Sequence, residues 1–193
     1  MKVIKTSIDD WDRKVIDEAV DVLACGGVVL YPTDTVYGLA ANIFDNGAVR
    51  KVFEIKKRSL LKPLSILVFD IEAINLVAKV SNDQKSVMKS YLPGPYTFIL
   101  PKRKIVPRVV TSGSKFVGVR VPDCDIARNL ARIFPITTTS ANISDREVLE
   151  NPLDIAEQLD FEVDLVIDAG PIKSKSPSSI IDLTGDSAKI VRR

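Results

Sequence analysis

The sequence predicts an α/β protein, and three observations lead to that class. Short runs of β-branched and other apolar residues alternate with longer segments of helical periodicity. Three of these short runs follow one another closely near the C-terminus, which indicates a mixed rather than a purely parallel sheet. No internal repeat and no long linker divides the chain of 193 residues. We therefore expect a single domain over residues 1–193, in which helices flank a twisted, mixed sheet.

Helices are expected where apolar residues recur at every third or fourth position. A glycine pair beginning at Gly26 closes the first helix, and Asp45 and Asp125 can cap two later ones. Asn151 followed by Pro152 is typical of a helix start. The expected helices span residues 11–25, 45–57, 72–77, 82–92, 125–133 and 151–159, and the expected strands 28–31, 64–69, 96–100, 117–121, 136–139, 164–167, 179–183 and 189–192.

The composition is that of an ordinary soluble domain. Hydrophobic residues make up 46% of the chain and charged residues 27%, and the formal net charge of +2 does not suggest a protein that coats nucleic acid. The cations gather at 50–62, 102–108, 173–175 and 192–193. Cys25 and Cys124 have neither metal-ligand nor disulfide spacing, which fits a reducing cytoplasm. No segment resembles a signal peptide or a membrane span, so we expect a cytoplasmic protein without membrane contact.

The absence of histidine narrows the possible chemistry. It excludes Ser-His-Asp and Cys-His nucleophilic machinery, histidine-ligated zinc and the commonest general base. Any reaction must therefore rely on carboxylates, lysines, arginines, hydroxyls and backbone groups.

The segment from Lys56 to Pro63 is the best candidate for binding a multiply charged anion. Lys56 continues the apolar stripe of the expected helix 45–57, whereas Lys57 falls on its outer side. Beyond the helix end, Lys56 and Arg58 would point the same way, and Lys62 would make a third cation at one cleft. The alternative is a lysine that reaches from a helix end to solvent beside two surface charges.

Polar side chains follow two of the expected strands. Thr33 and Thr35 come directly after strand 28–31, and Thr138, Ser140 and Asn142 occupy alternate positions at the end of strand 136–139. Ligands in α/β folds bind at strand ends, and short hydroxyl and amide groups let a phosphate or nucleotide approach closely. On its own the first segment is a weak signal, and ordinary turn chemistry is the more frequent explanation of the second.

Arg120 alternates with valines inside an expected strand. It lies either on the polar face of a half-covered sheet or inside a cleft, where its guanidinium would match a carboxylate. Near the C-terminus, Ser178 precedes strand 179–183 and Arg192 lies in the last strand.

Taken in order, these segments resemble the YrdC-like family of threonylcarbamoyl-AMP synthases (TsaC/Sua-type). The shared motifs are PTDTVYGLAAN, the K-x-R run with its following KPL, PGPYTFIL, GVRVP, SAN and SSIIDLT, and they span nearly the whole chain. The resemblance implies a twisted α/β sheet around a large, basic cavity. It also implies a nucleotidyltransferase that condenses L-threonine, bicarbonate and ATP, with Mg²⁺, into threonylcarbamoyl-AMP and pyrophosphate, for the t⁶A modification of tRNA by a downstream threonylcarbamoyl transferase complex.

The resemblance also implies a role for each candidate residue. Arg120 should take the threonine carboxylate, with Thr35 and Ser178 nearby. Lys56 and Arg58 should be the catalytic cations. The expected ATP site comprises Lys56, Arg58, Lys62, Thr138, Ser140, Asn142 and Arg192, and no protein ligand to a metal is expected.

Several positions depart from the family pattern. Phe116 stands where a small hydroxyl residue is common, Asp145 follows Ser144 where glycine is usual, and Val148 replaces a frequent hydroxyl. The extra C-terminal domain of the longer Sua-type members is missing from these 193 residues. PGPYTFIL and PSSIIDLT also resemble the YciO branch, so a YciO-like paralogue with weak synthase activity is one alternative.

A second alternative is a module that binds structured RNA, such as tRNA or double-stranded RNA, without chemistry. The cation clusters at 102–108 and 173–175 are compatible with it. Against it, the chain has no RNP-type aromatic pair, no GXXG loop and no large positive excess.

Overall fold

The computed structural model describes residues 1–160, 162–173, 176–185 and 187–192. Lys175 and Arg193, which belong to two of the basic clusters, lie outside these residues. Within the described part, the helices are α1 (Arg13–Ala24), α2 (Asn46–Ile55), α3 (Ile74–Val77), α4 (Asn82–Lys89), α5 (Asp125–Leu130) and α6 (Pro152–Gln158). The strands are β1 (Lys2–Lys5), β2 (Val29–Tyr31), β3 (Gly38–Ala40), β4 (Ser65–Leu67), β5 (Tyr96–Pro101), β6 (Phe116–Arg120), β7 (Ile136–Thr138), β8 (Leu165–Asp168), β9 (Ser179–Asp182) and β10 (Lys189–Arg192).

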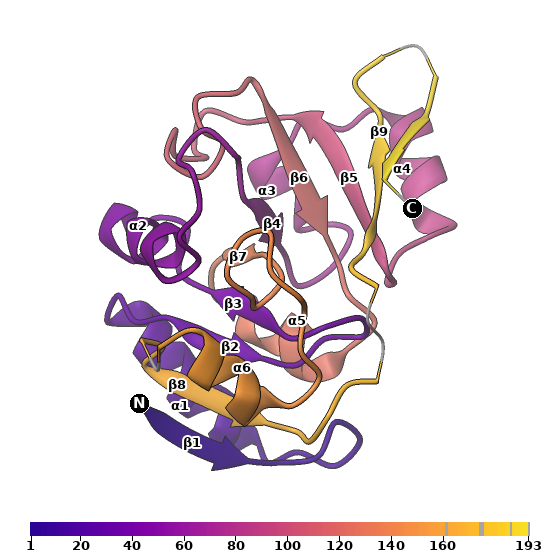
Figure 1. Cartoon of the computed structure of the whole chain (residues 1–193). Coiled ribbons are helices and arrows are strands. Elements are labelled where there is room, and N and C mark those ends of the chain that lie inside the picture. The colour runs from indigo at the N-terminus through magenta and orange to yellow at the C-terminus, as the bar shows by residue number, and fades with distance from the viewer. Residues whose placement is uncertain (161, 174–175, 186, 193) are drawn as a thin grey trace.

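The strands form two mixed sheets. A four-stranded sheet has the order β1-β8-β2-β3, and a six-stranded sheet has the order β10-β9-β5-β6-β4-β7. Figure 1 shows the first sheet in the lower half of the molecule and the second in the upper half, with β9 and α4 at the upper right. The α/β class with mixed strand pairing is confirmed, although the sequence predicts one sheet rather than two.

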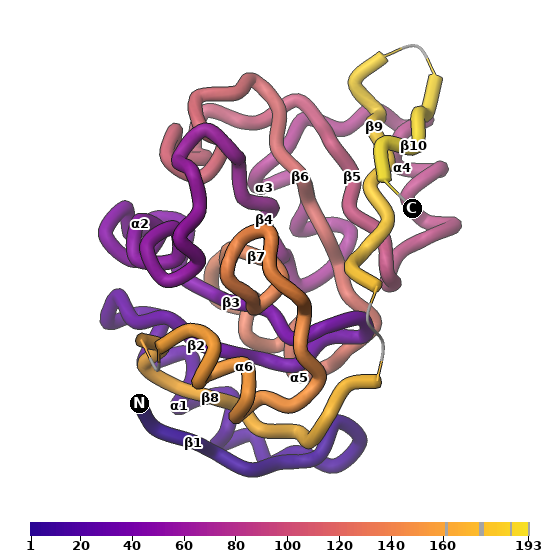
Figure 2. Tube along the Cα trace, in the orientation of Figure 1, coloured from indigo at the N-terminus to yellow at the C-terminus, as the bar shows by residue number. Residues whose placement is uncertain are grey.

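The two sheets meet where β3 runs beside β7. The Leu39 N–H donates to the Thr139 carbonyl at 3.0 Å, and the Thr137 N–H donates to the Ala41 carbonyl at 2.8 Å. An isolated antiparallel bridge also joins Gly38 to Ser140. Figure 2 shows the segment after β7, in orange, between the two halves of the fold. The polar segments after β2 and β7 are therefore held next to each other.

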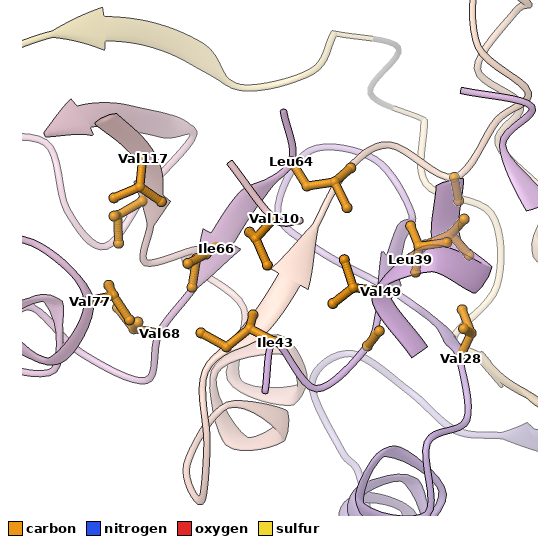
Figure 3. Packing of buried hydrophobic residues seen from close by; sticks show 14 of the residues in the cluster. Val28, Leu39, Ile43, Val49, Leu64, Ile66, Val68, Val77, Val110 and Val117 are labelled. Atoms are coloured by element: carbon orange, nitrogen blue, oxygen red, sulfur yellow. The ribbon is translucent and has the colours of Figure 1, made fainter. Parts of the chain in front are cut away.

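Two hydrophobic clusters fill the protein on either side of the sheets. The larger cluster includes side chains from α2, α3, β3, β4 and β6 and from the residue just before β2, as the labelled side chains of Figure 3 show. The smaller cluster packs α1 and α5 against the other face of the four-stranded sheet. Its members include Ala19 and Leu23 of α1 and Leu165 of β8, all fully buried. Both sheets are therefore covered by helices, as the fold class predicts.

Most predicted elements appear at the expected places. Asp45 caps α2 by accepting from the N–H groups of Gly47 and Ala48, and Asn151 caps α6 with Pro152 at the first turn. The predicted cap at Asp125 is wrong. Cys124 is the residue at the cap position of α5 and makes no side-chain cap bond. Instead, the Asp125 carboxylate pairs with Arg128 one turn later.

We expect Gly38→Ala to destabilise the protein. A Cβ atom at this position would lie 2.9 Å from two ring atoms of Tyr31, whose side chain is fully buried. Overpacking of this kind costs about 1–3 kcal/mol of unfolding free energy. Gly185→Ala is the matched control, because nothing lies within 4 Å of the added Cβ there. Urea denaturation of both variants measures the difference, and equal stabilities would contradict this account of the junction.

Candidate functional site

A polar cavity lies at the junction of the two sheets. Three arginines line it: Arg58 from the segment after α2, Arg120 from β6 and Arg192 from β10. The other polar lining is mostly hydroxyl-bearing and consists of Thr33, Tyr37, Ser65, Thr97, Thr138, Thr139, Ser140 and Ser178. No aspartate or glutamate is among the lining residues in the described part of the chain. A cavity with this lining suits an anionic, hydrogen-bonding ligand.

Arg120 is the most deeply buried of the three arginines, with 5% of its surface exposed. Its NH2 nitrogen forms an ion pair with Asp34 and donates to the Thr35 hydroxyl at 3.0 Å. The second Asp34 oxygen accepts from the Asp123 N–H at 3.1 Å. The Arg120 Nε atom is buried without a partner in the described part of the chain. The NH2 group is therefore fixed by Asp34 and Thr35, and the Nε donor is enclosed by the protein.

The end of α2 explains how Arg58 reaches the cavity. The Lys57 N–H donates to the Glu54 carbonyl and the Arg58 N–H to the Phe53 carbonyl, the paired bonds of a Schellman motif. Lys57 has a positive φ of 49°, which reverses the chain direction after the helix. The Arg58 guanidinium then donates to the carbonyls of Lys62 and Pro63 at 3.0 and 2.9 Å. These bonds close the 58–63 segment over the guanidinium.

Lys56 is directed inward, as the helical periodicity predicts, and only 1% of its surface is exposed. Its ammonium donates to the Ser140 carbonyl and to the carbonyl and Oδ1 of Asn142, the latter two at 2.7 and 3.2 Å. Burial lowers the pKa of Lys56 to about 7, and repulsion by Arg58 acts in the same direction. Lys56 is not among the residues that line the cavity.

The segment after β7 has its own network. The Ser140 hydroxyl donates to Asn142 Oδ1 at 2.7 Å, and Asn142 Nδ2 donates to the carbonyls of Ile143 and Arg146 at 3.0 and 2.7 Å. The Thr138 hydroxyl accepts a bond from the fully buried Tyr31 at 3.0 Å. Thr138 and Ser140 line the cavity, whereas Asn142 lies behind them.

The C-terminal strand closes another side of the cavity. The Arg192 guanidinium donates to the Ser178 carbonyl from Nε at 3.3 Å and from NH2 at 2.7 Å. The Ser178 hydroxyl shares a hydrogen bond of 2.8 Å with that of Thr97. Partial burial lowers the pKa of Arg192, and the positive charge of Arg120 adds to that effect. Arg120 and Arg192 therefore both contribute positive charge to this cavity.

Six of the ten residues proposed from the sequence line this one cavity: Arg58, Arg120, Thr138, Ser140, Ser178 and Arg192. Thr35, Lys56 and Asn142 are buried and reach the cavity only through their bonds to lining residues. Lys62 is exposed, and it pairs with Asp145 at 3.3 Å rather than entering the cavity. The roles of all ten toward a ligand stay predictions.

Asp34 was not predicted from the sequence, and neither were the lining residues Ser65, Thr97 and Thr139. Asp34 lies between Thr33 and Thr35, and its side chain is 11% exposed. The only signal in the sequence was a carboxylate among hydroxyls at a strand end, which does not identify Arg120 as its partner. Of the departures from the family pattern, Phe116 is exposed at the start of β6 and Val148 is half-buried, and neither lines the cavity.

The fold and this cavity define a class, that of mixed α/β proteins with an arginine- and hydroxyl-lined cavity where two sheets meet. The particular family follows from comparison with known proteins. Residues 21–193 match the Sua5/YciO/YrdC family model, described as "Telomere recombination". The chain belongs to this family.

Relatives with known names or structures support that assignment. A "Putative threonylcarbamoyl-AMP synthase" of Methanocaldococcus jannaschii is 40% identical over 93% of this chain and 86% of its own length. The structure of Pyrococcus abyssi Sua5 complexed with L-threonine matches all of this chain and 57% of its own, with a TM-score of 0.93 and 34% identity. This chain therefore spans little more than half of that relative. Escherichia coli YciO gives a TM-score of 0.88 and 32% identity over 94% of its length.

Within the described part of the chain, no helix is both long enough and apolar enough to cross a membrane.

We expect Asp34→Asn to lower the free energy of unfolding much more than Asp145→Asn does. Asp34 pairs with Arg120 where both side chains are buried, and removing one member of a buried pair costs about 3–5 kcal/mol. Asp145 pairs with Lys62 in solvent, where an ion pair contributes less than about 1 kcal/mol. Chemical denaturation of the two variants gives the comparison. Similar losses from both would mean that Asp34 does not fix Arg120.

The stability of the wild-type protein, relative to Lys56→Met, should rise as the pH increases from about 7 towards 10.5. Over this range an unfolded lysine holds its proton while the buried one has lost it, so the unfolded state binds more protons. The advantage should therefore grow by up to about 1.4 kcal/mol per pH unit. Unfolding free energies across this range test the slope, with Lys57→Met as the exposed control. A slope of zero or opposite sign contradicts the lowered pKa.

Proposed function

We propose that this protein is a threonylcarbamoyl-AMP synthase, a nucleotidyltransferase that acts on L-threonine, bicarbonate and ATP. The observation that carries the proposal is the convergence of three arginines and a set of hydroxyls in one cavity, in a chain 40% identical to a relative named for this activity. The proposed product is the activated donor for the t⁶A modification of tRNA. A separate transferase complex would consume it.

The threonine subsite is proposed around Arg120. Arg120 lines the cavity and its guanidinium is suited to the carboxylate of an amino acid, while Asp34 and Thr35 hold it in place. Ser178 would contribute a hydroxyl beside Thr97, which is paired with Arg120 in the sheet. The L-threonine complex of the Pyrococcus abyssi relative supports the choice of amino acid.

The chemistry needs no protein nucleophile. The threonine amine combines with bicarbonate to give a carbamate and water. A carbamate oxygen then attacks the α-phosphorus of ATP, and the bond from that phosphorus to the bridging oxygen breaks to release pyrophosphate. The contribution of the protein is to hold the reactants together and to neutralise negative charge. Both tasks suit a site built from arginines and hydroxyls.

Arg58 and Arg192 are proposed to face the phosphates of ATP. They enter the cavity from different elements. The Thr138 hydroxyl, which accepts from Tyr31 and keeps its own proton, adds a donor. Mg²⁺ is included in the proposal as the companion of ATP, because this ion keeps most of its water and usually binds through substrate phosphates. Lys62 would need to leave Asp145 in order to add a further charge.

A YciO-like protein of lower activity is the second candidate. Escherichia coli YciO and the Pyrococcus abyssi synthase are 34% and 35% identical to this chain, so similarity alone does not separate them. The rate of pyrophosphate release, compared with that of the Pyrococcus abyssi enzyme under the same conditions, decides between the two. A comparable rate supports a synthase, and a much lower one supports the YciO-like alternative.

We expect pyrophosphate release only when ATP, bicarbonate and threonine are all present, together with a threonylcarbamoyl-AMP product detected by mass spectrometry. Omitting any one of them should abolish release. Arg58→Ala should lower turnover by roughly a hundredfold, as for loss of one preorganised donor to the transition state. Lys57→Ala is the matched control, because its side chain is exposed and pairs with Asp160. Release that is independent of threonine would overturn the proposal.

A further inference from the structure

Lys56 is bound to the segment after β7 through both its main chain and its side chain. The Lys56 carbonyl accepts from the Ser144 N–H at 2.8 Å, and its ammonium donates to oxygens of Ser140 and Asn142. A single residue at the end of α2 thus contacts three positions within residues 140–144, here called the 140–144 loop.

The ammonium has no proton left for a ligand in this arrangement. It carries three donors, and three oxygen acceptors of the loop occupy them. Two of these acceptors are backbone carbonyls, which cannot be moved without moving the chain. Only 1% of the residue is exposed, and it lies behind Ser140 rather than among the residues that line the cavity.

We infer that Lys56 is a positioning residue, which holds the 140–144 loop in the conformation that presents Ser140 to the ligand, and that it does not itself contact the phosphates. This inference refines the proposed function, because it assigns direct phosphate binding to Arg58 and loop positioning to Lys56.

The cost of burying a cation supports this role. A buried charge is tolerated when hydrogen-bond acceptors surround it, and here every acceptor belongs to the loop. The lowering of the Lys56 pKa to about 7 by burial fits an amine held away from solvent. If the ammonium were withdrawn, the Ser140 carbonyl would lose one of its donors and Asn142 Oδ1 would keep only Ser140. The loop would then be free to open locally.

Amine acetylation of the wild-type protein tests the inference without any variant. Lys56 should be acetylated at least about tenfold more slowly than Lys57, whose side chain is 63% exposed, because acetylation requires the loop to open. Adding ATP should not change the low rate at Lys56. Rapid acetylation of Lys56 in the free protein, followed by protection when ATP binds, would overturn the inference and indicate direct phosphate contact.

Hydrogen exchange of peptides covering 138–146 gives the second test. In Lys56→Met, amide exchange in this segment should accelerate by about tenfold or more, because the loop has lost its central donor. In Arg58→Ala the same amides should exchange as in the wild type, although ATP binding is weakened. Exchange unchanged in Lys56→Met would also overturn the inference. Asn142→Ala removes one of the acceptors. If both residues act on the same loop, the double variant should exchange these amides little faster than Lys56→Met alone.

These readouts remain interpretable if the proposed function fails. Acetylation and hydrogen exchange in the free protein report on the loop alone, so they can support the positioning role even in a protein that releases no pyrophosphate. Conversely, a protein that releases pyrophosphate with all three substrates, but acetylates rapidly at Lys56, keeps its proposed function and loses the positioning role.

Discussion

The main-chain junction between β3 and β7 is the constraint on which the rest of the site depends. Main-chain hydrogen bonds, among them those from Leu39 to Thr139, from Thr137 to Ala41 and from Ala141 to Tyr37, tie the four-stranded sheet to the six-stranded one. Each sheet supplies part of the cavity lining: Thr33 follows β2 in one sheet, while Arg120 and Arg192 come from the other. The junction sets the distance between these walls.

The site contains two buried cations that are compensated in different ways. Arg120 has a carboxylate partner in Asp34, so the pair is close to neutral and Arg120 can line the cavity without a large unpaired charge. Lys56 donates instead to neutral oxygens, and all of them belong to the 140–144 loop. An ion pair orients a donor towards the cavity, whereas a network of carbonyls holds a segment of chain in place.

Features set by local sequence could be predicted, and features set by distant pairing could not. Helical periodicity indicated that Lys56 faces inward, and Asp45 and Asn151 marked two helix starts correctly. Strands β1 and β3 were missed. Three of the four β1 residues are exposed and give no core pattern, and β3, Gly-Leu-Ala, has little β propensity and owes its form to β2. The partnership of Asp34 with Arg120 joins the loop after β2 to the end of β6, so no local pattern reveals it.

The end of α2 gives a physical reason for the K-x-R spacing. The sequence alone suggested that Lys56 and Arg58 point the same way, which holds for an extended chain. Lys57 instead adopts a left-handed backbone conformation, and the chain reverses between the two cations. Lys56 can then point into the protein as the last inward residue of the helix, while Arg58 emerges at the cavity wall. A Schellman turn places one residue, here Lys57, between the last helical position and the residue that leaves the turn. With this spacing, Lys56 can hold the 140–144 loop while Arg58 supplies a positive charge to the cavity.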